Sequence, residues 1–300
     1  MAETSSFSRR NAFSIGAAMP LGIGMAGSAD AATPKLDLST AAERLRVRMK
    51  VTASLKPEPQ YRFYRLHLYA YMNEGNLVPL FTMNNINVTT ATKTGDNAYS
   101  IVGFESGVYC KFDTDEVLDV WENPITGEKR EVWQFIGGPL KGTITADGVD
   151  TGAGATVKPK EMRMEQIGDM VFVPSQSAFK FPHPMKREEW PKESSGPTFF
   201  WDSHFVYGAK VEDVLNPNID SAPAFCQFQN LVSWHPWLGL GGKEGRSYGK
   251  AYGTKLKSLD ELPPHIIKQF RDKTPEIFDT GNWTEFKDDF KDFMKTRKPT

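Results

Sequence analysis

The stretch YRFYRLHLYAYM, residues 61–72, decides the fold, because its side chains alternate in character along the chain. Apolar, non-aromatic side chains stand at every second position from Leu66 to Met72, and His67 and Tyr69 lie between them. Successive side chains of a β-strand point to opposite faces, so the pattern predicts a strand with one aliphatic face and one aromatic-polar face. Such a strand suits a barrel that holds a ligand inside. The alternative is a sandwich strand with a solvated tyrosine face.

Strand patterns continue after this stretch, to about residue 255. The further candidates are 78–90, 99–112, 117–122, 129–135, 162–167, 170–179, 199–208, 225–234 and 247–256. The sequence NPITG, Asn123 to Gly127, joins two of them in a tight hairpin, because Pro fixes φ and Gly permits a positive φ. The succession of short strands and turns predicts a mainly β protein with antiparallel strands.

Helical patterns appear near the end of the chain. Ser258 with Glu261 and Asn282 with Glu285 are capping-box candidates, and aromatic residues then recur at helical spacing up to Phe293. We therefore expect C-terminal helices within residues 258–297, packed against the sheet.

The N-terminus has the order of an export signal. Ser8-Arg9-Arg10-Asn11-Ala12-Phe13 precedes an uncharged run, and Ala29-Asp30-Ala31 fits a processing site. Paired arginines favour the twin-arginine route. The sequence predicts a signal over residues 1–31, a periplasmic bacterial protein, and a single mature domain over residues 32–300. An unprocessed N-terminus is the alternative.

The composition narrows the ligand class. The formal net charge of -1 offers no electrostatic attraction for nucleic acid or an anionic membrane. Aromatic residues make up 12% of the chain, with 20 Phe, 9 Tyr and 7 Trp, which favours an aromatic or apolar small molecule as ligand. Cys110 and Cys226 cannot form a disulfide framework. Two buried thiols are the favoured interpretation, and a single bridge stays open.

Two features of the sequence argue against other chemistries. Gly245-Arg246-Ser247-Tyr248-Gly249 matches the G-x-S-x-G pattern of a serine hydrolase, but the glycines around it do not suit the helix that must follow the serine. The five histidines are far apart in sequence and form no short ligand pattern, so we expect no metal and no other cofactor.

The stretch SWHPW, residues 233–237, is the most chemically concentrated part of the chain. Two indoles flank His235, and the candidate oxyanion-stabilising residues lie downstream; these are Arg246, Tyr248, Tyr252 and Lys255. Such a set could stack an aromatic ligand, move a proton and stabilise a phenolate or alkoxide. The alternative is a core corner in which the tryptophans pack and the histidine satisfies a backbone group.

Three motifs carry a family resemblance. The segment from Gly107 to Glu128, with its "W-x-NP-x-TGe" hairpin, the W-x-PW block at Trp234 to Trp237, and the later Gly245-Arg246 resemble a domain-of-unknown-function family of bacteria and fungi. The likeness spans residues 40–270. It implies a lipocalin-like, calycin-type β-barrel. It also suggests a relation to lyases that remove the γ-hydroxymethyl group of lignin-derived diaryl compounds as formaldehyde and leave a stilbene.

The resulting hypothesis is a cofactor-independent lyase, with His235 or His67 as the base. His235 stands where many family members carry an acidic residue. The candidate substrate-binding residues are aromatic or imidazole side chains: Trp121, Trp133, Trp234, Trp237, Tyr69, Tyr109 and His204. A non-catalytic periplasmic barrel that binds an aromatic or apolar molecule is the alternative, a serine hydrolase using Ser247 is a third, and a homodimer is possible.

Overall fold

Ten antiparallel strands form one sheet in the computed structural model, which describes residues 34–150, 162–285 and 289–300. The strands are β1 (Gln60–Tyr71), β2 (Leu77–Gly95), β3 (Ala98–Cys110), β6 (Phe135–Thr145), β7 (Gly148–Asp150), β8 (Glu165–Ile167), β9 (Met170–Pro182), β10 (Thr198–Lys210), β11 (Phe225–Val232) and β12 (Arg246–Leu256). Their order is β7-β6-β3-β2-β1-β12-β11-β10-β9-β8. The predicted export signal lies outside the described residues.

The side chains of β1 define the two faces of this sheet. The inner face carries Leu66 and Leu68, which are buried, and the outer face carries His67 and Tyr69, which are partly buried. The alternation matches the pattern in the sequence. Residues paired across neighbouring antiparallel strands share a face, so the register assigns the other strands to the same two faces.

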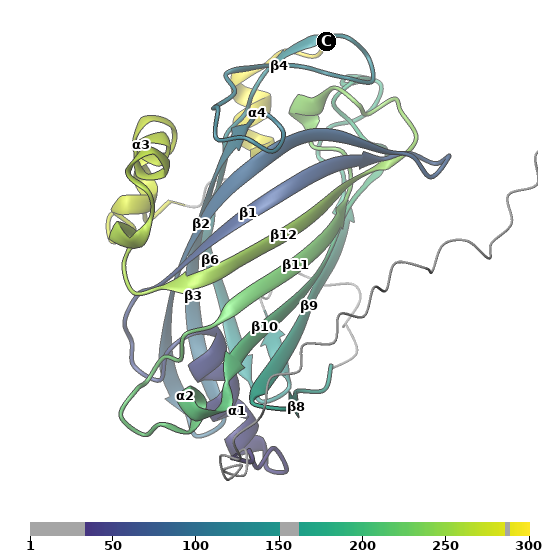
Figure 1. The fold of residues 1–300 in the computed structure, drawn as a ribbon. Helices are drawn as coiled ribbons and strands as arrows, with labels where there is room; N and C mark the ends of the chain where they lie inside the picture. The colour runs from purple at the N-terminus through teal and green to yellow at the C-terminus, as the bar shows by residue number, and fades with distance from the viewer. Residues whose placement is uncertain (1–33, 151–161, 286–288) are drawn as a thin grey trace, which may run out of the picture. The chain divides into compact units, whose positions relative to one another are not determined.

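Helix α1 (Ala41–Thr52) shows that the inner face is concave. Met49 packs in one cluster with Ala91 of β2 and Ile144 of β6, whereas Val51 packs with Val173 of β9. Strands β6 and β9 stand near opposite ends of the sheet. One helix can touch both only if the sheet curls around it, as Figure 1 shows.

The predicted fold class is confirmed. The sheet is antiparallel and curls as a half-barrel, consistent with a lipocalin-like barrel with helices packed on it. The further helices are α2 (Val211–Leu215), η1 (Pro236–Leu238), η2 (Leu259–Glu261), α3 (Pro264–Lys273), η3 (Pro275–Phe278) and α4 (Asp289–Thr296). Helix α3 covers part of the outer face, where Ile266 and Phe270 pack with Ile86, Val88 and Val108.

Helix α1 was not predicted, because its sequence AAERLRVRMKVT interrupts the apolar pattern with charged residues. Two of these, Arg48 and Lys50, are buried. Lys50 Nζ donates to the carbonyl oxygens of Val214 (2.8 Å) and Asn216 (2.6 Å), which compensates for the loss of water around the ammonium group.

The hairpin of β4 (Val120–Glu122) and β5 (Lys129–Glu131) turns through the predicted NPITG segment. Asn123 Oδ1 accepts the Ile125 N–H at 2.9 Å, and Gly127 adopts a φ of 71° that the turn requires. The amide of Asn123 also donates to the Leu238 carbonyl oxygen at 3.0 Å. This turn therefore ties the hairpin to η1.

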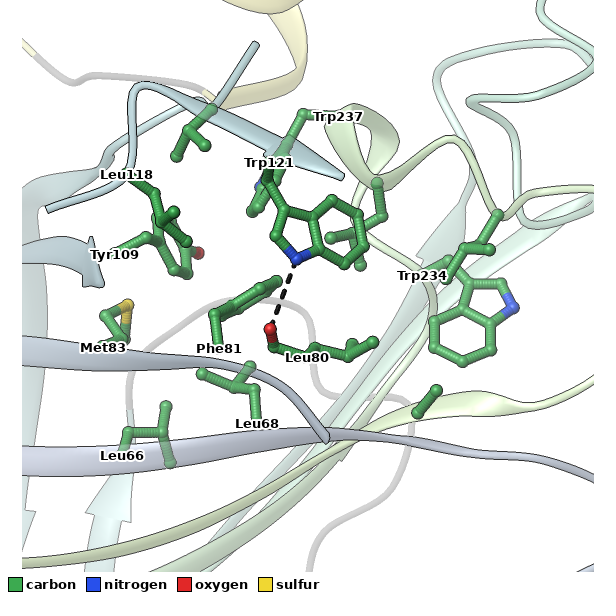
Figure 2. Packing of buried hydrophobic residues seen from close by; sticks show 14 of the residues in the cluster. Leu66, Leu68, Leu80, Phe81, Met83, Tyr109, Leu118, Trp121, Trp234 and Trp237 are labelled. Atoms are coloured by element: carbon green, nitrogen blue, oxygen red, sulfur yellow. Dashed lines mark hydrogen bonds between the residues drawn. The ribbon is translucent and has the colours of Figure 1, made fainter. Parts of the chain in front are cut away.

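Beneath the hairpin lies a group of four rings that we call the core aromatic cluster (Figure 2). It consists of Phe81, Tyr109, Trp121 and Trp237, whose contacting ring centroids lie 4.8 to 5.6 Å apart. None of the four is more than 5% exposed. The indole of Trp121 donates to the Leu80 carbonyl oxygen at 3.3 Å. The cluster fills the inner side of β1 to β3.

Both cysteines are free and buried, which confirms the favoured interpretation. No helix in the described part of the chain is long and apolar enough to span a membrane.

Candidate functional site

The predicted site residues do not converge on one place. The register pairs Tyr69 with Tyr248 and His67 with Lys250, which places all four on the outer face. Tyr252 pairs with Arg65 on the same face. The imidazole of His67 lies 3.2 Å from the exposed carboxylate of Asp113, and Arg246 and His204 are exposed.

A shallow hollow of about 390 Å³ lies on this outer face. Its lining residues come from β1, β11 and β12: Phe63, Arg65, Phe225, Cys226, Gln227, Tyr252, Gly253 and Thr254. Of the predicted site residues, only Tyr252 lines it. The hollow therefore does not assemble the predicted chemistry.

Most of the predicted ring-binding residues are part of the core. Trp121, Tyr109 and Trp237 belong to the core aromatic cluster, and Trp234 is 1% exposed, with its indole donating to the Lys243 carbonyl oxygen at 2.9 Å. Trp133 is partly buried against Phe293. For Trp234 and Trp237, the structure agrees with the alternative in which the tryptophans of the SWHPW stretch pack in the core.

His235 is different, because its ring is only partly buried and one of the two rings that it faces, Trp201, retains accessible surface. Its centroid lies 6.0 Å from that of Trp201 and 6.1 Å from that of Phe199. The register pairs Trp201 with Phe179 and Phe199 with Phe181, on the inner face of β9 and β10. We call these five residues the His235 ring cluster. Its contacting centroids lie 5.3 to 6.1 Å apart, and all members except Phe199 are only partly buried.

The electrostatic state of His235 follows from these surroundings. Its ring makes no hydrogen bond or ion pair with any other described residue, and burial lowers its pKa to about 4. A group surrounded by apolar rings loses the hydration that would stabilise its charged form. The imidazole is therefore neutral at neutral pH and has a free nitrogen that can accept a proton.

A second polar group on the inner face was missed in the sequence. Arg62 is 6% exposed, and its Nη1 donates to Asn87 Oδ1 (2.7 Å) and Thr89 Oγ1 (3.1 Å). The Asn87 amide in turn donates to Glu105 Oε1 at 2.9 Å. Burial raises the pKa of Glu105, against the lowering effects of Asn87 and Arg62. One feature of the sequence could have revealed it: Arg62 falls at every-second-residue spacing with the aliphatic positions Leu66 and Leu68, and so on the same face of the predicted strand.

Aromatic and thiol groups flank this network. Tyr207 and Tyr64 have raised pKa values, and burial raises the pKa of Cys226 to about 12. The cause is desolvation of the charged forms in each case. All three groups are therefore protonated at neutral pH.

Lys255 lies on the inner face opposite Arg62 in the register. Its Nζ donates to the carbonyl oxygens of Lys50 (3.0 Å) and Ala53 (2.8 Å) at the end of α1. Burial holds its pKa well below the usual value. In the structure, Lys255 ties helix α1 to the sheet.

Ser247 does not have the surroundings of a nucleophile. It lies within β12, whereas a nucleophile elbow places its serine between a strand and a helix. Its Oγ is buried and has no hydrogen-bond partner among the described residues. No base contacts it there.

Metal binding finds no support in the residues that the structure describes, because they contain no group of three or more His, Cys, Asp or Glu side chains positioned around one point.

Comparison with known proteins identifies the family but no activity. A family model described as "Protein of unknown function (DUF1838)" matches residues 60–292. Comparison with curated proteins gave no match. The matched segment contains the sheet from β1 to β12, the hairpin and the His235 ring cluster, and the chain therefore belongs to the DUF1838 family.

Proposed function

We propose that this protein binds an aromatic small molecule at the His235 ring cluster and acts on it as a cofactor-independent lyase. The observation that carries the proposal is the imidazole of His235, which has no hydrogen-bond partner among the described residues and faces the rings of Trp201 and Phe199. A perturbed titratable group among accessible aromatic side chains is typical of a functional site.

The aromatic rings account for the ligand class. Phe179 and Trp201 stack with their planes 13° apart, at a centroid distance of 5.9 Å. Partly buried ring faces of this kind favour a flat aromatic group over a flexible polar one. The charged neighbours of these rings along β9 and β10 are Lys180 and Asp202, which lie on the outer face, and this favours a substrate that is uncharged at this end.

The reaction that we expect uses a 1,2-diaryl-1,3-propanediol. His235 takes the proton of the primary hydroxyl, the bond to that carbon breaks, and formaldehyde leaves. The released electron pair forms the double bond of a stilbene as the benzylic hydroxyl departs. That hydroxyl takes the proton and becomes water, so the diol is converted to one stilbene, one formaldehyde and one water. The same resemblance that implies a calycin-type barrel supports this chemistry.

Binding without reaction is the second candidate. It is favoured by a specific observation: no carboxylic acid, lysine or arginine among the described residues forms a hydrogen bond or ion pair with the His235 ring. The acid that would protonate the leaving hydroxyl must then be His235 itself. A purely binding role needs the rings alone.

The test is to incubate the purified protein with a 1,2-diaryl-1,3-propanediol and to follow stilbene absorbance and formaldehyde together. We expect equal amounts of both products, their loss in His235→Gln, and their retention in His204→Gln, which changes an exposed histidine of the outer face. Saturable quenching of tryptophan fluorescence without product would leave the binding role. Neither binding nor product would overturn both candidates.

A further inference from the structure

Asn85 is a buried amide without a partner. It pairs with Tyr64 of β1 and with Gly107 of β3, so its side chain lies on the inner face. The residue is 6% exposed, and its side chain forms no hydrogen bond with any other described residue. Neither of its two amide atoms is fully enclosed. Buried polar groups in proteins are almost always hydrogen-bonded, so the missing partner of Asn85 calls for an explanation.

Asn87 shows how the same strand satisfies an amide on the inner face. It lies two residues further along β2, on the same side of the sheet. Its Oδ1 accepts from Arg62 Nη1 at 2.7 Å, and its Nδ2 donates to Glu105 Oε1 at 2.9 Å. Both ends of this amide are therefore used within the chain, whereas both ends of Asn85 are free among the residues that the structure describes.

Asn230 of β11 adds a second unused donor to the inner face. It pairs with Ser203 of β10 and is 6% exposed. Its Oδ1 is enclosed, but its Nδ2 is not and has no hydrogen-bond partner in the described part of the chain. This face therefore has donors without acceptors, and a ligand that supplies an acceptor would remove the cost of leaving a donor unpaired.

Two accessible rings lie beside these amides. Tyr64, the partner of Asn85 in the register, contacts Phe228 at a centroid distance of 5.4 Å, and Phe228 contacts Phe205 at 4.9 Å. Phe228 stands two residues from Asn230, on the same face of β11. The rings of Phe205 and Phe228 are only partly buried. Accessible ring faces of this kind favour an aromatic ligand.

Packed regions lie on both sides of this part of the inner face. Along β2, Phe81 belongs to the core aromatic cluster and Ala91 packs with α1, and Asn85 stands between them. On β9, the residue that pairs with Phe205 is Ser175, which is small and partly accessible. A ligand bound beside Asn85 would therefore lie in the middle of the inner face.

The charged groups at the neighbouring positions have partners within the chain. Arg62 and Glu105 lie two residues before Tyr64 and Gly107 on their strands, and they interact electrostatically with each other. Lys255, which is opposite Arg62, donates to two backbone carbonyl oxygens at the end of α1. These charges do not call for a charged ligand, and the unpaired groups are neutral amides.

We propose that the middle of the inner face binds an uncharged aromatic molecule whose ring lies against Phe205 and Phe228 and whose oxygen atom accepts a hydrogen bond from Asn85 Nδ2. This site is separate from the His235 ring cluster, because Phe205 is four residues further along β10 than Trp201, about 13 Å at the rise of a strand. The proposal does not depend on proton transfer by His235.

The experiment compares benzophenone with 1,1-diphenylethylene, in which a CH₂ group replaces the carbonyl oxygen, by equilibrium dialysis with the purified chain. The wild type should bind benzophenone about 10-fold more tightly, because only the ketone satisfies the buried amide. Asn85→Leu should remove this preference. Gln227→Leu is the matched control, since it changes an exposed amide that lines the outer hollow, and it should keep the preference, as should His235→Gln.

Ultraviolet irradiation of bound benzophenone locates the site without any variant, because the excited ketone attaches to nearby C–H bonds. Peptide mass spectrometry should find the label on inner-face residues such as Leu66 and Met83, and not on Phe63 or Thr254 of the outer hollow. Circular dichroism checks that the variants are folded.

Four results would overturn the proposal: equal affinity of the wild type for the two probes, a preference that persists in folded Asn85→Leu, label confined to the outer face, or binding of neither probe. Stilbene formation from the diol alongside any of these results would leave the lyase proposal intact. Conversely, the expected preference without any stilbene would support this site and count against the lyase.

Discussion

The core aromatic cluster and the His235 ring cluster have similar ring spacings but different surroundings. In the first, all four rings are at most 5% exposed, and the Trp121 indole has a backbone acceptor. In the second, most rings keep accessible surface, and the imidazole has no hydrogen-bond partner among the described residues. Aromatic content by itself therefore does not locate a binding site. Accessible ring faces beside an unsatisfied polar group are the better criterion.

The two arginines of β1 repeat this contrast in charge. Arg65 pairs directly with the carboxylate of Asp115, whereas Arg62 donates to the neutral side chains of Asn87 and Thr89, and Asn87 in turn donates to the carboxylate of Glu105. The His235 ring cluster and Arg62 are both on the inner face. This face is the one that we expect to meet a ligand.

The largest expected effect comes from the core aromatic cluster. Trp121→Ala removes a ring that contacts two others, Phe81 and Trp237, and should lower the free energy of unfolding by about 3–5 kcal/mol. Urea denaturation followed by circular dichroism measures this. A loss below about 1 kcal/mol would mean that the cluster is not a packed core.

His235 should make stability depend on pH. The unfolded chain takes up a proton near pH 6.5, whereas the folded imidazole has a pKa of about 4, so stability is fully present above pH 6.5 and is lost as the pH falls towards 4. The full difference corresponds to about 3 kcal/mol, and the accessible part of the ring reduces this to about 2 kcal/mol.

Denaturation at pH 7.0 and 4.5 measures this loss, with His235→Gln as the comparison because it has no titrating ring. The variant should lose less stability than the wild type over this range. Equal losses in the two proteins would show that His235 titrates normally.

Trp201 should affect binding more than folding. Trp201→Ala removes a partly buried ring, so the affinity for an uncharged stilbene or diaryl ligand should fall about 10-fold while most of the stability is retained. Fluorescence titration with the ligand, together with a melting curve, separates the two effects. Unfolding without a change in affinity would assign Trp201 to the core.

The smallest effect is expected on the outer face. Tyr252 is 55% exposed, and Tyr252→Ala should change the free energy of unfolding by about 0.5 kcal/mol or less and leave ligand affinity unchanged. The same denaturation and titration experiments serve as the check. A clear loss of affinity would point to the outer hollow as the binding site.

Local patterns predicted those parts of the fold that depend on local rules. The alternating side-chain character of residues 61–72 matches the alternating burial along β1, and Asn123 and Gly127 make the predicted turn. Helix α1 was not predicted, because Arg48 and Lys50 are buried on it. Only groups from distant parts of the chain compensate for the loss of water around such charges. For Lys50, these are the carbonyl groups of Val214 and Asn216.

The candidate site, too, was only partly predictable from the sequence. The W-x-PW block singled out His235, but the structure places its two tryptophans in the core and sets the imidazole against two rings of β10 instead. Arg62 could be read as an anomaly in a strand pattern. Its hydrogen bonds to Asn87 and Thr89 could not be predicted, because they depend on how β1 pairs with β2.

The sequence by itself determined the antiparallel β class, the faces of β1, the hairpin turn and the family, since each depends on neighbouring residues or on recurring motifs. Only the tertiary structure decided which aromatic rings pack and which stay accessible, and which arginine pairs directly with a carboxylate. The physical reason is that accessibility and charge compensation depend on what the curled sheet brings together from distant strands, and alternation along one strand contains no information about the residue that faces it.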